Sequence, residues 1–497
     1  MKPTLLKLDT SHLTADSEAL LRCQTALEFR DKGEYFNAQE VMRPLWRAIG
    51  ERPNLERLSP SVAAEVLLCV GILTAWIGSK NQIKYAPEAA KDLITESLSI
   101  YDSLHDALKV AAARAEIAYC YWHEGALGEA RIWFNEALQK LTTEGNTRAR
   151  ALLRLAIVEW SASRYDEAKK ILTDNRRLFE RISNHAIKGG YHHQLAMLLR
   201  RFAISEKRDD YFQEAILEYQ QADQDFRLAQ NLLFRANVKN NLGNLLRNLG
   251  RFAEAHKYLD EARRLTVRIK DRVETAQIDD TRAQMLIDEG RLAEAEAVAR
   301  RAVSILEKSG QQCLLADTLI THGIALARLS DPMPEPAHFT LQRAMEIADQ
   351  VGAYNKAGLA ALTLIEELAD KLAPELVVAA YNGAERWLAE LQESKEVQLR
   401  LNAAARKVLA RNPLSVKATE SVATICNLHD EVLKFEATLI SRALAATNER
   451  VTKAAVLLHT SHQTLSSILA GRQSKLLAAR SPIRPRGRRR ANKSRKK

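Results

Sequence analysis

The feature that most constrains the fold is a seven-position pattern of small and large apolar residues that recurs along the chain. Its clearest copy runs from Ala118 to Ala137, a second from Gly243 to Ala262, and a third from Ala283 to Ala302. In all three copies the intervals between pattern positions are 3, 4, 2, 3, 4 and 3 residues. Residues three or four apart share one face of a helix, so each copy predicts a pair of packed helices.

The residue types give this spacing a physical meaning. A glycine in the middle of each copy ends the first helix, because glycine readily adopts the left-handed conformation that follows a helix. Small residues in the second helix let the two helices approach closely, and the large residue between them fills the remaining gap. We therefore expect the recurring small residue of the second helix to be buried in every pair. These anchors are Ala38, Ala90, Ala130, Ala168, Ala215, Ala255, Ala295 and Ala337.

The pattern resembles the tetratricopeptide repeat family over roughly residues 20–350. Most anchors are 38 to 42 residues apart, whereas the family period is about 34 residues. We interpret the difference as longer helices. The resemblance implies an all-α solenoid whose concave surface binds a protein or peptide, with Asn237, Asn240 and Asn244 as polar candidates on that surface. The alternatives are a rigid spacer without a ligand and, for these asparagines, ordinary solvated helix positions.

The repeat fades after Gly352, and three further helices are expected at 356–372, 374–391 and 396–410. They are suited to cap the array, since a terminal repeat needs a polar outer face. Asn412-Pro413 then interrupts the chain. The predicted organisation is a repeat array (1–352), capping helices (353–411), a linker (412–427), a helix-turn-helix domain (428–478) and a disordered basic tail (479–497).

Residues 428–478 predict one long helix, 428–446, and two short helices, 451–458 and 462–470, joined by a three-residue turn. The long helix carries an apolar stripe that we expect to mediate homodimerisation. Ala455, Leu458, Leu465 and Leu469 are the predicted core, as in a helix-turn-helix. Ser461 is a predicted N-cap and Gly471 a predicted C-cap. The stripe consists of Leu428, Val432, Phe435, Leu439 and Ala443.

From Glu436 to Leu476 the sequence resembles the Fis-type helix-turn-helix of bacterial transcription regulators. The resemblance rests on Leu439-Ile440, Ala443-Leu444, Val451-Thr452-Lys453-Ala454-Ala455, Leu457-Leu458, Ser461 and Thr464-Leu465. It implies that Thr452, Lys453, Ser461, Gln463 and Thr464 lie near DNA. The chain departs from the family at Glu449-Arg450, where the family usually has Gly-Asn. It departs again at His459-Thr460, where the family has Gly-Ile, and at His462, where a basic residue is common.

Together these observations predict a DNA-binding regulator. Gln463 and Ser466 are expected to read bases, because glutamine pairs bidentately with adenine and serine can donate or accept. Lys453, Arg472, Lys475 and the tail are expected to contact phosphates. The alternative is an interaction scaffold in which 428–478 is only a structural cap. The full predicted DNA-binding set is Thr452, Lys453, Ser461, His462, Gln463, Thr464, Ser466, Ser467, Arg472, Lys475, Arg488, Arg489 and Arg490.

The positive charge is concentrated at one end of the chain. The formal net charge is +11, and Arg480–Lys497 contains ten Arg or Lys and no acidic residue. The rest of the chain therefore carries only +1. A basic tail indicates a local anchor on nucleic acid rather than a broad basic surface. A solubility tail and a nuclear localisation signal are the other interpretations.

The sequence contains no phosphate-binding loop, dinucleotide fingerprint or nucleophile–base set, so we expect neither an enzyme nor a cofactor. Adjacent helical residues such as His192 and His193 point about 100° apart and are poorly placed to share a metal. The five cysteines have neither metal-ligand nor redox spacing, which favours a reduced, cytoplasmic compartment. The apolar run Val66–Ile77 is too short to span a bilayer and predicts a buried helix.

Overall fold

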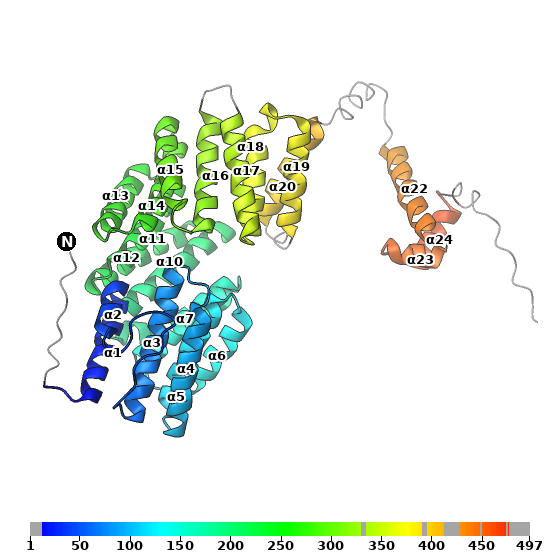
Figure 1. The fold of residues 1–497 in the computed structure, drawn as a ribbon. Helices are drawn as coiled ribbons and strands as arrows, with labels where there is room; N and C mark the ends of the chain where they lie inside the picture. The colour runs from blue at the N-terminus through cyan, green and yellow to red at the C-terminus, as the bar shows by residue number, and fades with distance from the viewer. Residues whose placement is uncertain are drawn as a thin grey trace, which may run out of the picture. The chain divides into compact units, whose positions relative to one another are not determined.

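The computed structural model describes residues 12–329, 334–389, 395–411, 428–447, 450–473 and 476. Every regular element in these residues is a helix, as the all-α prediction requires (Figure 1). The chain divides into two compact units, 1–405 and 406–497. Each unit is described by itself.

The first unit is a succession of helices joined by short connections. They are α1 (Ala15–Asp31), α2 (Tyr35–Met42), α3 (Pro60–Lys80), α4 (Ala86–Ser103), α5 (Ala107–His123), α6 (Leu127–Lys140), α7 (Asn146–Ser161), α8 (Tyr165–Asp174), α9 (Arg176–Arg181), α10 (His185–Glu206), α11 (Asp209–Leu228), α12 (Leu232–Asn248), α13 (Phe252–Arg268), α14 (Arg272–Asp288), α15 (Leu292–Leu306), α16 (Gln312–Arg328), α17 (Glu335–Gln350), α18 (Tyr354–Leu368), the 3-10 helix η1 (Ala369–Lys371), α19 (Pro374–Trp387) and α20 (Lys395–Arg411).

These helices pack as successive pairs, such as α12 with α13 and α14 with α15, and the first helices of neighbouring pairs also contact one another. All eight anchor alanines are buried, with at most 1% of their surface exposed, so this prediction is confirmed. The small residue of the first helix matters equally. A Cβ on Gly243 would lie 2.7 Å from Leu259 Cγ, so α12 and α13 need glycine at this contact.

The glycines predicted to end first helices do so. Gly125, Gly250 and Gly290 have φ of 79°, 70° and 75°, and a Cβ on any of them would meet nothing within 4 Å. Only the left-handed backbone therefore favours glycine at these turns. The sequence pattern identified both the position of each turn and the reason for its residue type.

The apolar run Val66–Ile77 lies inside α3, which is 21 residues long. By length and composition α3 could cross a membrane, yet 83% of its most apolar window is buried inside the protein. The prediction of a buried helix is therefore confirmed.

The helices expected after Gly352 are present with shifted ends. α18 covers Tyr354–Leu368, α19 covers Pro374–Trp387 and α20 covers Lys395–Arg411. α18 packs against both α17 and α19, so it continues the array. The guanidinium of Arg400 on α20 donates to both carboxylate oxygens of Glu366, at 2.8 and 2.7 Å.

The second unit contains α22 (Leu428–Ala446), α23 (Val451–Leu457) and α24 (His462–Ala470), drawn in orange in Figure 1. α23 packs against both α22 and α24. The core of this unit contains the predicted core residues except for Leu458, which is only half-buried. The buried members of this core are Ile440, Ala443, Leu444, Ala454, Ala455, Leu465 and Leu469.

Candidate nucleic-acid interface and array surface

The predicted DNA-reading residues lie on one small helix of the second unit. On α24, His462, Gln463, Thr464 and Ser467 are exposed, and Ser466 is half-buried. Buried Leu465 and Leu469 hold the opposite side of the helix against the core. Thr452 and Lys453 are exposed at the start of α23. Lys475, Arg488, Arg489 and Arg490 lie outside the described residues.

Ser461 is the N-cap of α24, as predicted. Its hydroxyl accepts a hydrogen bond from the Thr464 N–H at 3.0 Å and lies 2.8 Å from the Thr464 hydroxyl. Capping satisfies one of the free N–H groups at the start of the helix. The Ser461 and Thr464 hydroxyls are therefore engaged with each other, whereas the outward residues that follow are not part of the cap.

The turn between α23 and α24 places a histidine where the resembled family has glycine. His459 has φ of 49°, in the left-handed region that favours glycine. The turn is closed by the Thr460 N–H, which donates to the Ala455 carbonyl at 2.9 Å. The departure from the family pattern thus keeps the turn and adds backbone strain to it.

Two residues after α24 tie the small unit together. The guanidinium of Arg472 forms a two-pronged ion pair with the Glu436 carboxylate on α22. Gln473 is buried and donates to the Leu433 carbonyl at 2.8 Å and to Glu436 at 3.2 Å. The sequence predicted a phosphate contact for Arg472 and missed Glu436 and Gln473. No local pattern links residues that are 36 positions apart, as Arg472 and Glu436 are.

α22 has two apolar sides. Ile440 and Leu444 face the core, whereas Val432, Phe435 and Leu439 of the predicted stripe are 56%, 68% and 40% exposed. We call these three residues the outer stripe. The small unit does not cover the outer stripe with its own described helices. Ala443, also predicted in the stripe, is buried in the core, and the Leu428 side chain lies outside the described residues.

In the first unit, a row of polar side chains crosses the first helices of three successive pairs, α12, α14 and α16. Arg247 on α12 donates to the Gln284 amide oxygen on α14. The Gln284 nitrogen donates to Asp280 at 2.9 Å and to Thr321 on α16 at 3.3 Å. We call Arg247, Asp280, Gln284 and Thr321 the polar ladder. It lies on the first helices, the side that a tetratricopeptide-like array is expected to present as concave.

The ladder and its surroundings contain buried polar atoms with unused hydrogen-bonding capacity. Among the described residues, Oδ1 of Asn240, Asn244 and Asp280 is buried and accepts no hydrogen bond. Burial raises the pKa of the Asp280 carboxyl to about 6. Asn240 and Asn244 were two of the predicted concave positions. An isolated sequence could not single out Asp280, because its burial depends on the neighbouring pairs.

His192 and His193 point to different partners. His192 Nδ1 lies 2.5 Å from Glu218 on α11, and His193 Nε2 lies 2.8 Å from the Asn241 amide on α12. Burial lowers the pKa of His193 to about 4. Within the described part of the chain, no group of three His, Cys, Asp or Glu side chains is placed to hold a metal ion.

The sequence model of the tetratricopeptide repeat family matches residues 234–308. This range covers the second and third copies of the pattern, so the resemblance is confirmed there. No curated protein sequence matches the chain.

Several solved structures are similar. The apo form of the quorum sensor NprR from B. thuringiensis is 13% identical with a TM-score of 0.47, and the match covers 68% of this chain and 90% of that one. The apo form of RapI is 12% identical with a TM-score of 0.48, covering 76% and 98%. A Rap protein complexed with competence and sporulation factor is 13% identical with a TM-score of 0.43, covering 67% and 98%.

Proposed function

We propose that the chain is a non-enzymatic, DNA-binding transcription regulator whose helical array binds a protein or peptide partner. The observation that carries the DNA-binding half is the outer face of α24. It presents His462, Gln463 and Ser467 to solvent from a helix whose other side is locked by Leu465 and Leu469. A rigid short helix with small polar side chains is suited to enter the major groove.

Gln463 is the proposed base-reading residue. Within the described residues it is exposed and takes part in no hydrogen bond that would need to be broken. Its amide can therefore pair bidentately with adenine, a contact worth about 1–3 kcal/mol of discrimination. Ser466 is the weaker candidate, because it is half-buried.

Affinity is proposed to come from cations beside α24. Lys453 is exposed at the start of α23, and the sequence adds Lys475 and the basic tail. Arg472 is held by Glu436, so its contact with phosphate requires the ion pair to open. The electrostatic part of the DNA-binding free energy should therefore come mainly from Lys453, Lys475 and the tail.

The proposed partner site of the array is the surface that carries the polar ladder. The buried, unused Oδ1 acceptors of Asn240 and Asn244 could receive hydrogen bonds from the backbone N–H groups of a bound extended peptide if these side chains turn outward. The outer stripe of α22 is the proposed homodimer contact, which would pair two DNA-reading units on two half-sites. The alternative function is an interaction scaffold that binds a partner without reading DNA. The observation that favours this alternative is the exposed apolar outer stripe, which could contact a different protein instead of a second copy of the chain.

The test is a salt titration of DNA binding with full-length protein, the truncation 1–477, and Gln463→Ala, on preferred and random duplexes. The preferred duplex is first selected from genomic fragments, with 1–427 as the negative control. If the tail makes roughly four phosphate contacts, truncation should flatten the slope of log K against log salt by about three to four units. Gln463→Ala should weaken only the preferred duplex, by about 1–3 kcal/mol.

Glu436→Gln sharpens the same experiment. Releasing Arg472 should steepen the salt slope by about one unit, because one more phosphate is neutralised. Equal binding by full-length protein and 1–427 would favour the scaffold. Equal weakening of both duplexes by Gln463→Ala would show that α24 does not read bases.

A further inference from the structure

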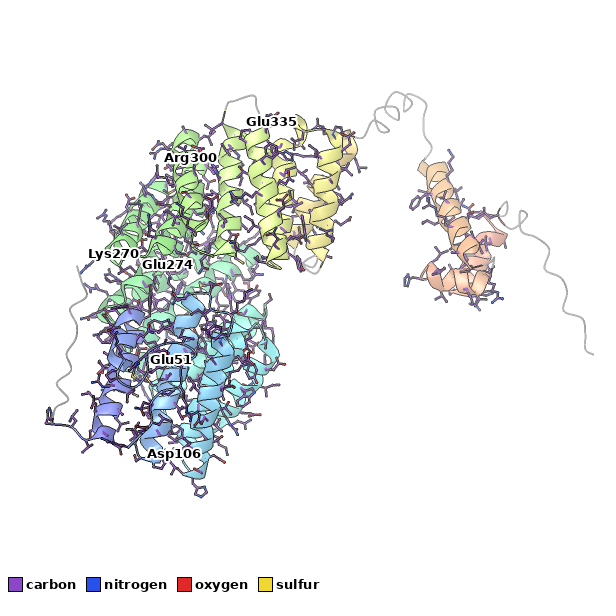
Figure 2. The ribbon with its side chains drawn as sticks, in the orientation of Figure 1. Glu51, Asp106, Lys270, Glu274, Arg300 and Glu335 are labelled. Carbon is purple, nitrogen blue, oxygen red and sulfur yellow. The ribbon has the colours of Figure 1, made fainter. Side chains whose placement is uncertain are left out.

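The ends of two early helices reach side chains far along the chain. Asp31 is the last residue of α1 and Lys80 the last residue of α3. Asn184 Nδ2 donates to the Asp31 carboxylate at 2.7 Å, and Asn231 Nδ2 donates to the Asp31 carbonyl at 2.9 Å. Lys80 Nζ lies 2.8 Å from Asp271 and 3.1 Å from Glu274. Glu274 is labelled in Figure 2, where green helices of the array meet blue ones.

The residues that receive these ends have a common place in the fold. Asn184, Asn231 and Asp271 are the N-caps of α10, α12 and α14. Each uses one side-chain oxygen to cap its own helix, accepting from the N–H three residues later at 3.0, 2.9 and 3.1 Å. The remaining side-chain atom reaches α1 or α3. The N-caps therefore serve two structural purposes at once.

The charges suit this arrangement. Asp31 lies against the N-terminal ends of α10 and α12, where a negative charge is favoured. Arg150 on α7 donates to both of its carboxylate oxygens, at 3.1 and 3.0 Å. The guanidinium groups of Arg150 and Arg30 and the Asn184 amide hold the pKa of Asp31 below its usual range despite its burial. The contact therefore stays ionised across the physiological range of pH.

The side-chain contacts described above that cross the seam between these elements are polar. Cavities of about 220 and 320 Å³ lie along the seam, and both are lined by Lys32 and Gln230. A small polar interface usually permits relative motion.

We propose that the seam between α1–α3 and the starts of α10, α12 and α14 is a gate in the array, which opens while α3 stays packed on α4 and α5. The contacts of Asp31 and Lys80 with the three N-caps, which we call the polar clasp, close the gate. Because the contacts of the clasp are hydrogen bonds and ion pairs, we expect them to open together while the helix pairs on either side stay folded. Opening exposes the seam and the starts of α10, α12 and α14. This inference rests on contacts within the array and does not depend on DNA binding.

Asn184→Asp tests the clasp without removing the cap. Aspartate caps a helix as well as asparagine does, but the new carboxylate would face Asp31 at hydrogen-bonding distance. We expect amide hydrogen exchange in the full-length protein to quicken about tenfold or more at residues 28–38 and 231–235 together, since one hydrogen bond to a charged group is worth about that factor. Exchange in α16–α19 should not change.

The matched control is Gln311→Asp, which adds the same charge at the N-cap of α16, outside the clasp. It should leave exchange at the seam unchanged. The double variant Asn184→Asp with Asp31→Asn exchanges the amide and the carboxylate of this contact. It should reverse at least half of the increase in the logarithm of the exchange rate. Lys80→Met should quicken exchange at 271–275 and at the end of α3.

Three outcomes would overturn the gate. In the first, exchange at the seam is unchanged in Asn184→Asp. In the second, the change is confined to the first turn of α10, which would indicate only a weakened cap. In the third, exchange quickens equally throughout the array, which would indicate general destabilisation rather than an opening at the seam.

Discussion

The array and the C-terminal unit solve the same packing problem in different ways. In the array, each helix pair has neighbours that cover its apolar faces, and the anchor alanines are buried. The C-terminal unit has a closed core of seven buried residues, yet it leaves Phe435 68% exposed. A repeat can rely on the next repeat, whereas a three-helix unit has too little interior to cover both sides of α22. This exposed outer stripe is the reason for proposing a partner on that face of α22.

The largest expected effect is on self-association through α22. Phe435→Glu should weaken a homodimer by roughly 2–4 kcal/mol, because large central aromatic residues dominate interface energies. Folding of the unit should change by less than about 0.5 kcal/mol, since Phe435 is exposed. Sedimentation equilibrium of full-length protein measures the dissociation constant. Ser441→Glu, exposed elsewhere on α22, is the control. A wild-type protein that stays monomeric at high concentration would contradict the dimer.

In the array, the buried carboxyl group of Asp280 is expected to lower stability. Its folded pKa of about 6 lies above the unfolded value of about 3.9, so the native state holds the extra proton and stability falls as pH rises from about 4 to 6. Asp280→Asn should remove this dependence and stabilise the array by up to about 3 kcal/mol at pH 8.

Denaturant unfolding at several pH values measures the effect of Asp280→Asn. The control is Asp279→Asn, which loses an ion pair with Arg263 at 2.9 Å and should destabilise instead. Parallel pH curves for Asp280→Asn and wild type would rule out Asp280 as the titrating group.

The anchors of the array should be intolerant of added volume. Ala255→Leu adds three side-chain carbons to a contact where Ala255 is fully buried, and should cost about 1–3 kcal/mol. Ala253→Leu, exposed on the same helix, should change stability by less than about 0.5 kcal/mol. Thermal and denaturant unfolding by circular dichroism compare the two variants. Equal stability of Ala255→Leu and wild type would refute the proposed role of the anchors.

The smallest effect compares turns in the two regions. His459→Gly should stabilise the C-terminal unit by up to about 1 kcal/mol, because φ of 49° strains any residue with a Cβ. Gly250→Ala in the array should do the opposite by a similar amount, since φ is 70° and the space around it is open. Hydrogen exchange, which reports the unfolding of each unit separately, measures both changes in stability. If both substitutions shift stability in the same direction, backbone strain is not the cause.

Local residue patterns are enough to predict the helices and the turns that join them. The Gly243–Ala262 spacing encodes two helices and the turn between them, and Ser461 encodes the start of α24, because helix faces, caps and turns depend on residues within about one helix pair. The same locality explains why the ends of α18 and α19 shifted while the helices themselves were found.

Which distant groups meet depends on how the helix pairs stack on one another. Asp31 and Asn231 are 200 positions apart, and their contact depends on the rotation accumulated over several helix pairs. Arg472 meets Glu436, and Asp280 is buried, through neighbours that no local spacing identifies. A small change in the rotation between successive helix pairs would leave every repeat intact but would move Asp31 and Lys80 away from the three N-caps. Each repeat of the array can therefore be predicted from its local sequence. The polar clasp and the burial of Asp280 depend on the assembled array.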